Sequence, residues 1–424
     1  MDNIYKNRRE FLKEMSLFAG ASAFMASVPW MNAFAQTNPS NLAASNRVRI
    51  GMVGVGSRGR ALLLNLQEIE NTEIVAVCDN YEPNYQRAIE LTGGKAKAFY
   101  DYREMIDMKD LDAIVIATPL HQHAHITVDF LNAGFHVFCE KSLARTLEDC
   151  KRMVDVQSET GKILQIGHQR LFNPVYLNAL ERIKAGEIGT IVQVRAFWHR
   201  NSDWRRKVPS PELERQINWR LYKESSAGLM TELAAHHIQV ANWFLDRIPT
   251  RVMGSGSICY WKDGREVYDH VAAIYDYDDG IKCIYDSVTA NKHYGLELQI
   301  QGDKGTLELE ANRIYSENPP TAPGIRQLIH NIEQGIFETI PIGGASWVPE
   351  TAVTYKGESL APYDDNDTYL ELVGFVEAVR NGKPYKNLLR EGYHASIAAL
   401  LGLQAMDTNQ IVEWPAEYIM EKEV

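Results

Sequence analysis

The sequence is poor in cysteine and in positive charge. Its five cysteines are spread over 424 residues without Cys-x-x-Cys spacing, at Cys78, Cys139, Cys150, Cys259 and Cys283. An odd number cannot pair completely, and the missing spacing gives no zinc motif. Most lie in apolar, strand-like text, so we expect buried, reduced thiols. Lys and Arg number 44 against 55 Asp and Glu, for a net charge of −11, which argues against nucleic acid or an anionic membrane as partner.

Long hydrophobic runs are also scarce, and the one clear case lies near the start. Residues 15–35 are mostly apolar and follow a leader with four basic residues, and the run ends in Ala33-Phe34-Ala35. This layout is typical of a secretory signal. Arg8 and Arg9 lie in Arg-Arg-Glu-Phe-Leu-Lys, which resembles the twin-arginine signal that exports folded proteins. We therefore expect a twin-arginine signal peptide (1–35), a polar linker (36–46), a periplasmic location and no membrane attachment after processing. An ordinary export signal or a retained anchor is the alternative.

The remaining length exceeds what one core usually serves, so two domains are expected. Apolar strands alternate with helical text over residues 47–168, which predicts a Rossmann domain with a doubly wound parallel sheet. Beyond about residue 190 the apolar residues alternate by twos, which predicts an α+β domain (169–424) with a large, mainly antiparallel open sheet. The fold class is thus α/β. Helices at 367–381 and 391–408 are expected to pack back on the first domain.

A glycine-rich turn follows the first expected strand. Gly54, Gly56 and Gly59 form a Gly-x-Gly-x-x-Gly motif with Ser57 and Arg58, and a helical stretch follows. Such a turn brings backbone N–H groups and a helix N-terminus to a pyrophosphate. The second strand ends at Asp79, whose carboxylate suits the ribose diol and repels a 2′-phosphate. The sequence therefore predicts bound NAD rather than NADP.

Two further motifs follow the fourth and fifth strands, where doubly wound sheets bind ligands. They are Thr118-Pro-Leu-His-Gln-His123 and Glu140-Lys141-Ser142. Together with Glu232-x-x-x-His236 they resemble motifs of the glucose–fructose oxidoreductase and inositol dehydrogenase (Gfo/Idh/MocA) family, over roughly residues 47–410. The resemblance implies an NAD(P)-dependent enzyme of sugars or cyclitols, and a homo-oligomer (dimer or tetramer) formed through the open sheet.

The resemblance also assigns site residues. It gives the cofactor contacts beyond the glycine turn and Asp79 as Thr118, His121, His123, Glu140, Lys141 and Gln169. The chain departs from the family pattern at four positions: Leu120 stands for Asn, Ser142 for Pro, Glu232 for Asp, and Gln239 for an acid. These departures leave the subfamily and the substrate contacts open.

The expected chemistry needs a base and a cation. Oxidation of an alcohol removes a proton from oxygen, which histidine can accept, while a lysine can hold the developing alkoxide. The predicted catalytic residues are Lys141, His236 and Glu232, with Glu232 orienting the imidazole from one helical turn away. The alternative is that His236 is a buried structural residue without a catalytic role. No third ligand accompanies Glu232 and His236, so no metal is expected.

Tryptophan and arginine gather between residues 198 and 220. Indole faces stack on sugars and guanidinium groups bind hydroxyls or carboxylates, although tryptophans also fill cores and interfaces. The predicted substrate contacts are Trp219, Arg220, Tyr222 and His237.

These features predict an exported NAD-dependent oxidoreductase that acts on a secondary hydroxyl of a sugar or glycoside. A cofactor that works outside the cytoplasm must be bound by the protein while it is still inside the cytoplasm. We therefore expect the cofactor to be tightly bound and recycled in place. Two other functions stay open. One is a redox-neutral, NAD-dependent glycosidase, which works by oxidation, elimination, hydration and reduction. The other is a binding protein that keeps NAD without catalysis.

Overall fold

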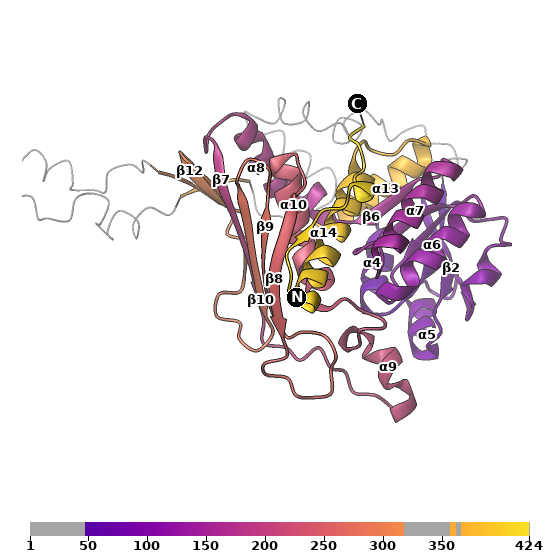
Figure 1. Cartoon of the computed structure of the whole chain (residues 1–424). Coiled ribbons are helices and arrows are strands. Elements are labelled where there is room, and N and C mark those ends of the chain that lie inside the picture. The colour runs from indigo at the N-terminus through magenta and orange to yellow at the C-terminus, as the bar shows by residue number, and fades with distance from the viewer. Residues whose placement is uncertain (1–46, 318–356, 362–365, 424) are drawn as a thin grey trace, which may run out of the picture.

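The computed structural model describes residues 47–317, 357–361 and 366–423. The predicted signal peptide and linker lie outside these residues. Two sheets stand on either side of a layer of helices (Figure 1). In the part of the chain that is described, no helix combines the length and apolar character needed to cross a bilayer.

The first sheet is parallel and has the strand order β3-β2-β1-β4-β5-β6, which confirms the predicted Rossmann domain. Its strands are β1 (Val48–Val53), β2 (Thr72–Cys78), β3 (Lys97–Phe99), β4 (Ala113–Ile116), β5 (His136–Glu140) and β6 (Leu164–Gly167). The helices around it are α4 (Ser57–Gln67), α5 (Glu82–Leu91), α6 (His123–Asn132) and α7 (Leu147–Thr160). Strands β4 and β6 are buried along their whole length, as expected of a sheet covered on both faces.

Local sequence explains where the helices of this domain begin and end. Thr146 caps α7 by accepting a hydrogen bond from Asp149 N at 3.1 Å, and the helix ends at Gly161 in the left-handed conformation. Asn173 caps α8 (Pro174–Lys184), whose first residue is a proline that needs no N–H partner.

The second sheet has nine strands in the order β14-β13-β12-β11-β7-β10-β9-β8-β15. They are β7 (Ile191–His199), β8 (Arg251–Ser257), β9 (His270–Asp276), β10 (Lys282–Val288), β11 (Leu296–Gly302), β12 (Gly305–Glu308), β13 (Arg313–Ser316), β14 (Glu358–Ser359) and β15 (Val412–Glu413). All neighbours pair antiparallel except β7 and β10, which run parallel. The prediction of a mainly antiparallel sheet is therefore confirmed.

Helix α14 (Leu388–Thr408) lies between the two sheets and packs on α10 (Ala235–Leu245), β8, β6 and α7. Small residues permit this close packing: a Cβ at Gly392 would lie 2.8 Å from Ile166, and the Tyr275 hydroxyl donates to the Ala398 carbonyl at 2.9 Å. The other late helix, α13 (Asp367–Asn381), packs on α4. One hydrophobic cluster includes residues of both sheets and of α14.

Residues 200–225, here called the arm, connect β7 to the helices that precede β8. The arm contains α9 (Glu214–Ile217) and the short turns η6 (Pro211–Leu213) and η7 (Trp219–Leu221). Its Gln216 amide donates to Asn80 of the first domain, at 2.9 Å to Oδ1 and 3.3 Å to the carbonyl. The arm therefore bridges to the edge where β2 ends.

None of the five cysteines forms a disulfide in the described structure. Cys78, Cys139, Cys150 and Cys283 are buried, as expected, whereas Cys259 is exposed.

Candidate active site

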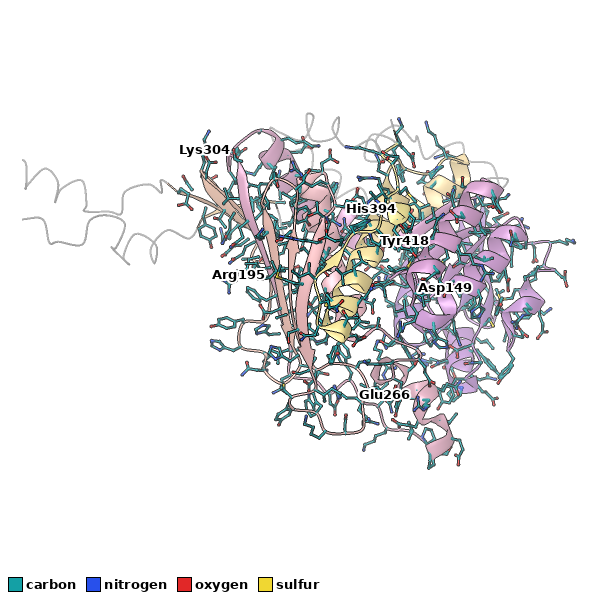
Figure 2. The ribbon with its side chains drawn as sticks, viewed as in Figure 1. Asp149, Arg195, Glu266, Lys304, His394 and Tyr418 are labelled. Carbon is teal, nitrogen blue, oxygen red and sulfur yellow. The ribbon has the colours of Figure 1, made fainter. Side chains whose placement is uncertain are left out.

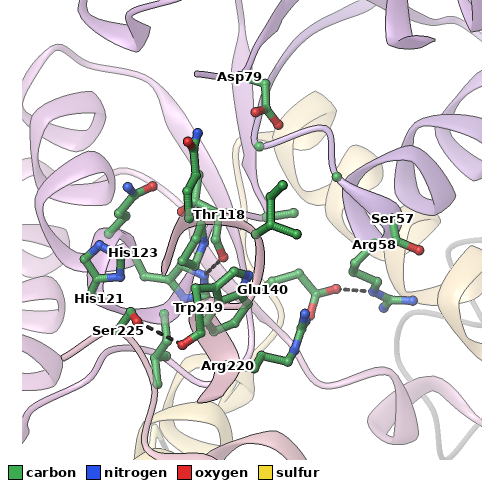
Figure 3. A pocket seen from close by; sticks show the side chains of 18 of the residues that line it. Ser57, Arg58, Asp79, Thr118, His121, His123, Glu140, Trp219, Arg220 and Ser225 are labelled. Atoms are coloured by element: carbon green, nitrogen blue, oxygen red, sulfur yellow. Dashed lines mark hydrogen bonds and ion pairs between the residues drawn. The ribbon is translucent and has the colours of Figure 1, made fainter. Parts of the chain in front are cut away.

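A cleft of about 1750 Å³ runs along the carboxyl ends of the parallel strands. One wall is formed by the turns after β1, β2, β4 and β5, and the opposite wall by the arm and by the helices that follow it. Asp79 lies at one end of the view in Figure 3 and Trp219 and Arg220 at the other.

The glycine turn forms a tight cradle at the floor of this cleft. Gly54 has φ +83°, and a Cβ there would lie 2.7 Å from the Ala117 carbonyl carbon and from Thr118 N. A Cβ at Gly59 would overlap the Gly54 carbonyl oxygen, whereas one at Gly56 would meet nothing nearer than Asn84, at 3.9 Å. Gly54 and Gly59 thus set the shape of the turn, and Gly56 leaves its backbone open toward the cleft.

Asp79 is fixed by three hydrogen bonds. Its Oδ2 accepts from Val55 N at 3.0 Å and from the Asn84 amide at 3.2 Å, and its Oδ1 accepts from Tyr81 N at 2.9 Å. Burial raises the pKa of this carboxyl, and the hydrogen bonds partly oppose that rise. A carboxylate has about four acceptor positions, so one remains for a ribose hydroxyl.

Two buried polar atoms in the cleft lack a protein partner. They are Thr118 Oγ1 and Gln169 Oε1, and both residues line the cleft. Buried polar groups are nearly always hydrogen-bonded, so these two fit a site whose ligand supplies the partner. With the open backbone at Gly56, they show that this cleft fits a dinucleotide.

The predicted contacts Arg58, Glu140, His121 and His123 all line the cleft, but three of them are partly engaged elsewhere. Arg58 Nε donates to Glu140 Oε1 at 2.6 Å (Figure 3), and Glu140 Oε2 accepts from Lys141 N at 3.1 Å. The ring nitrogens of His123 lie 2.9 Å from the Ser142 carbonyl and 3.0 Å from the Thr118 carbonyl. Burial lowers the pKa of His123, so its neutral ring mainly positions these two loops.

Lys141 is held at the centre of the site by backbone oxygens. Its Nζ donates to the Glu232 carbonyl at 2.8 Å and to the Thr231 carbonyl at 3.2 Å. Burial lowers the pKa of the ammonium, and the carboxylates of Glu232 and Glu140 oppose this effect. An ammonium has three N–H groups, so one is left for a bound oxygen.

Glu232 does not orient His236. Its carboxylate accepts from Arg220 Nε at 2.8 Å, and no bond to the imidazole is present among the described contacts. The expectation assumed a regular α-helix, but Met230–Ala234 form a π-helical turn, and the Glu232 carboxylate is bound by Arg220 instead. Burial opposes ionisation, yet Arg220 and Lys141 hold the pKa of Glu232 below its ordinary value.

His236 lines the cleft next to aromatic rings. Its ring centroid lies 5.8 Å from that of Trp198 and 6.0 Å from that of His168. Burial, followed by the charge of Lys141, lowers its pKa well below the ordinary value. The imidazole is therefore neutral at physiological pH and can accept a proton.

The four predicted substrate residues divide into two pairs. Trp219 and Arg220 line the cleft, with the guanidinium 4.3 Å from the indole centroid. Tyr222 and His237 do not line it. Tyr222 turns its hydroxyl to Glu214 at 2.7 Å, which supports the arm, and His237 is fully buried against Trp198 and Tyr285.

Sequence reasoning missed several residues of the cleft. Asn84 binds Asp79 from α5, while Asn80 and Gln216 join the two walls. Arg206 also lines the cleft from the arm. These residues belong to no motif, and only the high density of arginines in the arm hinted at such a role. Among the described residues, no three His, Cys, Asp or Glu side chains converge into a metal-binding group.

The cradle, the fixed acid after β2 and the unpartnered polar atoms define a class: an NAD-binding oxidoreductase with a Rossmann domain. Residues 48–168 match the family model described as "Oxidoreductase family, NAD-binding Rossmann fold", and residues 176–308 match "GFO/IDH/MocA C-terminal domain". The chain belongs to the Gfo/Idh/MocA family, and its cofactor is NAD.

Individual relatives agree with this assignment. Inositol 2-dehydrogenase of Salmonella typhimurium is 30% identical over 384 residues, which cover 87% of this chain and 98% of that protein. "Glycosyl hydrolase family 109 protein 1" of a Shewanella species (strain MR-4) is 28% identical over 246 residues, which cover 52% of this chain and 51% of that protein. The structure of levoglucosan dehydrogenase with NADH and levoglucosan has a TM-score of 0.67 at 21% identity, covering 87% of this chain and 100% of that one, and shows the same fold.

Proposed function

We propose that this chain is an exported NAD-dependent oxidoreductase that acts on a secondary hydroxyl of a sugar or glycoside, with a tightly bound cofactor that is recycled in place. One observation carries the proposal: Lys141 and His236 line the same cleft as Trp219 and Arg220. A proton acceptor, a cation and a sugar-stacking surface thus share one cavity with the cofactor cradle. The similarity to inositol 2-dehydrogenases supports a polyhydroxylated substrate.

The proposed chemistry gives each of these residues a task. The third N–H of Lys141 binds the hydroxyl oxygen and stabilises the negative charge that develops on it. Neutral His236 takes the hydroxyl proton. The bound nicotinamide supplies the hydride acceptor. Trp219 stacks on the sugar ring, while Glu232 fixes Arg220 so that its remaining N–H groups point to substrate oxygens.

A redox-neutral glycosidase is the second candidate, and the similarity to the glycosyl hydrolase family 109 protein favours it. In that function a bound nicotinamide would serve first as hydride acceptor and then as hydride donor to the same sugar, and a glycosidic bond would break between the two steps. A second carbonyl substrate is then unnecessary. A non-catalytic NAD-containing protein is the third, weaker candidate, because Lys141 and His236 line one cleft.

Mass spectrometry of the products separates the three candidates. The purified protein is incubated with a panel of sugars and aryl glycosides. A product lighter by two hydrogens supports the oxidoreductase, a released aglycone supports the glycosidase, and no product supports the binding protein.

The two proposed catalytic residues are tested by substitution. Lys141→Ala and His236→Ala should each lower turnover by about two to four orders of magnitude while NAD stays bound. Lys292 and His293 are exposed, are adjacent to each other in the sequence and do not line the cleft. They give the matched controls Lys292→Ala and His293→Ala. Near-native turnover of either test variant would contradict its assigned role.

A further inference from the structure

Arg206 occupies a fixed position on the inner side of the arm. Its backbone N–H donates to Asn218 Oδ1 at 2.7 Å, and its carbonyl accepts from Asn218 Nδ2 at 3.0 Å. Asn218 is only 2% exposed and also donates to Glu214 at 3.0 Å. A buried side chain thus holds the backbone of Arg206 in place, and Arg206 lines the cleft.

The other arginines of the arm that line the cleft are mostly neutralised by carboxylates. Arg205 pairs with Asp263 and Glu214, Arg215 with Glu224 and Glu266, and Arg220 with Glu232. The Arg206 guanidinium has no hydrogen-bond or ion-pair partner among the described residues. Burial lowers its pKa, and the two charged groups that act on it, Arg220 and Arg60, are cations that lower it further. The surroundings of Arg206 therefore favour an anion.

The hydrogen bonds of the arm locate Arg206 along the cleft. Gln216 of the arm bonds to Asn80, which follows Asp79 at the ribose end. Arg220 bonds to Glu232, whose carbonyl accepts from Lys141 at the reacting end. Arg206 is bound through its backbone to Asn218, which lies in the chain between Gln216 and Arg220, so Arg206 lies between the two ends. A dinucleotide that reaches from Asp79 to Lys141 has its doubly charged pyrophosphate in this middle stretch.

We propose that Arg206 binds the pyrophosphate of NAD from the arm, opposite the glycine turn, and thereby slows release of the cofactor. The glycine turn offers only neutral N–H groups and a helix N-terminus, so the arm supplies a full positive charge. The Gln216–Asn80 contact holds the arm closed beside the adenosine end. This inference depends on NAD binding and not on the identity of the proposed sugar substrate.

The test measures the rate of cofactor release. Protein loaded with NADH is mixed with excess ADP-ribose, and the fluorescence of bound NADH is followed for the wild type, Arg206→Gln, Arg206→Lys and Arg195→Gln. Arg195 is an exposed arginine on the outer side of the second sheet (Figure 2), so its variant controls for lost charge. We expect Arg206→Gln to release NADH at least about tenfold faster, Arg206→Lys to be intermediate, and Arg195→Gln to match the wild type.

A second measurement identifies the anion. Protein freed of its bound nucleotide is titrated with ADP, which carries the pyrophosphate, and with adenosine, which does not. Arg206→Gln should lower the affinity for ADP and leave the affinity for adenosine unchanged. Equal losses of affinity for both ligands, or NADH release from Arg206→Gln at the wild-type rate, would overturn the proposal. Both measurements are made without substrate turnover, so they can succeed even where the proposed sugar oxidation fails.

Discussion

His394 shows how burial couples a single residue to pH. It lies on α14, is 1% exposed, and its Nε2 accepts a hydrogen bond from Met420 N at 3.0 Å. Figure 2 shows it in the layer between the two sheets. Burial and, to a smaller extent, Arg390 lower the pKa of His394 to about 3. The ring is therefore neutral in the folded protein at any pH above that value.

This depressed pKa predicts a pH-dependent contribution to stability. Between about pH 6.5 and pH 3 the unfolded chain binds a proton at His394 that the folded protein does not. The stabilisation is complete above about pH 6.5 and is lost as the pH falls, by up to about 1.4 kcal/mol per pH unit. His394→Gln keeps an acceptor for Met420 N but cannot titrate. Urea unfolding should show the variant less stable at pH 7, with the gap narrowing at pH 5. A gap that stays constant would contradict the assigned pKa.

At the residue scale, sequence patterns predicted groups fixed by short motifs and missed those fixed by tertiary partners. The glycine turn, Asp79, Thr118 and Lys141 line one cleft because each follows a parallel strand and those strand ends share an edge. The predicted partner of Glu232 was wrong, because its actual partner Arg220 comes from the arm, and neither that contact nor the π-helical turn can be read from the spacing.

At the element scale, α4 depends on glycines that serve different purposes. Gly59 lets the helix approach the Gly54 carbonyl, while Gly56 borders open space in the cleft. Gly59→Ala should lower the free energy of unfolding by about 1–3 kcal/mol even without nucleotide, because the new methyl group overlaps backbone.

Gly56→Ala is the matched variant on the same turn. It adds the same methyl group at a residue with φ −63°, so unliganded stability should change little, while the rise in melting temperature on adding NAD should shrink. Thermal unfolding with and without NAD measures both effects. Equal destabilisation of the unliganded protein by the two substitutions would contradict this division of roles.

The elements of the first domain and the long strands of the second were predictable from the period of their apolar residues. Runs of apolar residues predict strands at 73–79 and 135–140, and these match β2 and β5 to within one residue at each end. The parallel pairing of β7 with β10 was missed, as were the short strands β13 and β15. Pairing partners depend on the whole sheet, and strands of two to four residues are too short to show a periodic pattern.

At the scale of the whole molecule, the export proposal joins the first 35 residues to the cofactor site. If the protein is exported, NAD must enter it before it leaves the cytoplasm, which a signal for folded proteins allows. Changing Arg8 and Arg9 to Lys should keep the protein in the cytoplasm, as cell fractionation would show. The control changes Lys6 and Lys13 to Arg and preserves the charge of the leader. Normal periplasmic yield from the Arg8/Arg9 variant would contradict the proposal.

The position of α14 has a mechanical consequence. Many two-domain enzymes admit ligands by a hinge that swings one domain away from the other. Here α14 packs on β6 and α7 of one domain and on β8 and α10 of the other, within a single hydrophobic cluster. A rigid-body rotation of the domains would separate the packed residues of that shared core. The arm, in contrast, is joined to the first domain by surface contacts such as that of Gln216 with Asn80. We therefore expect the nucleotide to exchange beneath the arm, a segment of about 26 residues, while the two domains keep their relative position.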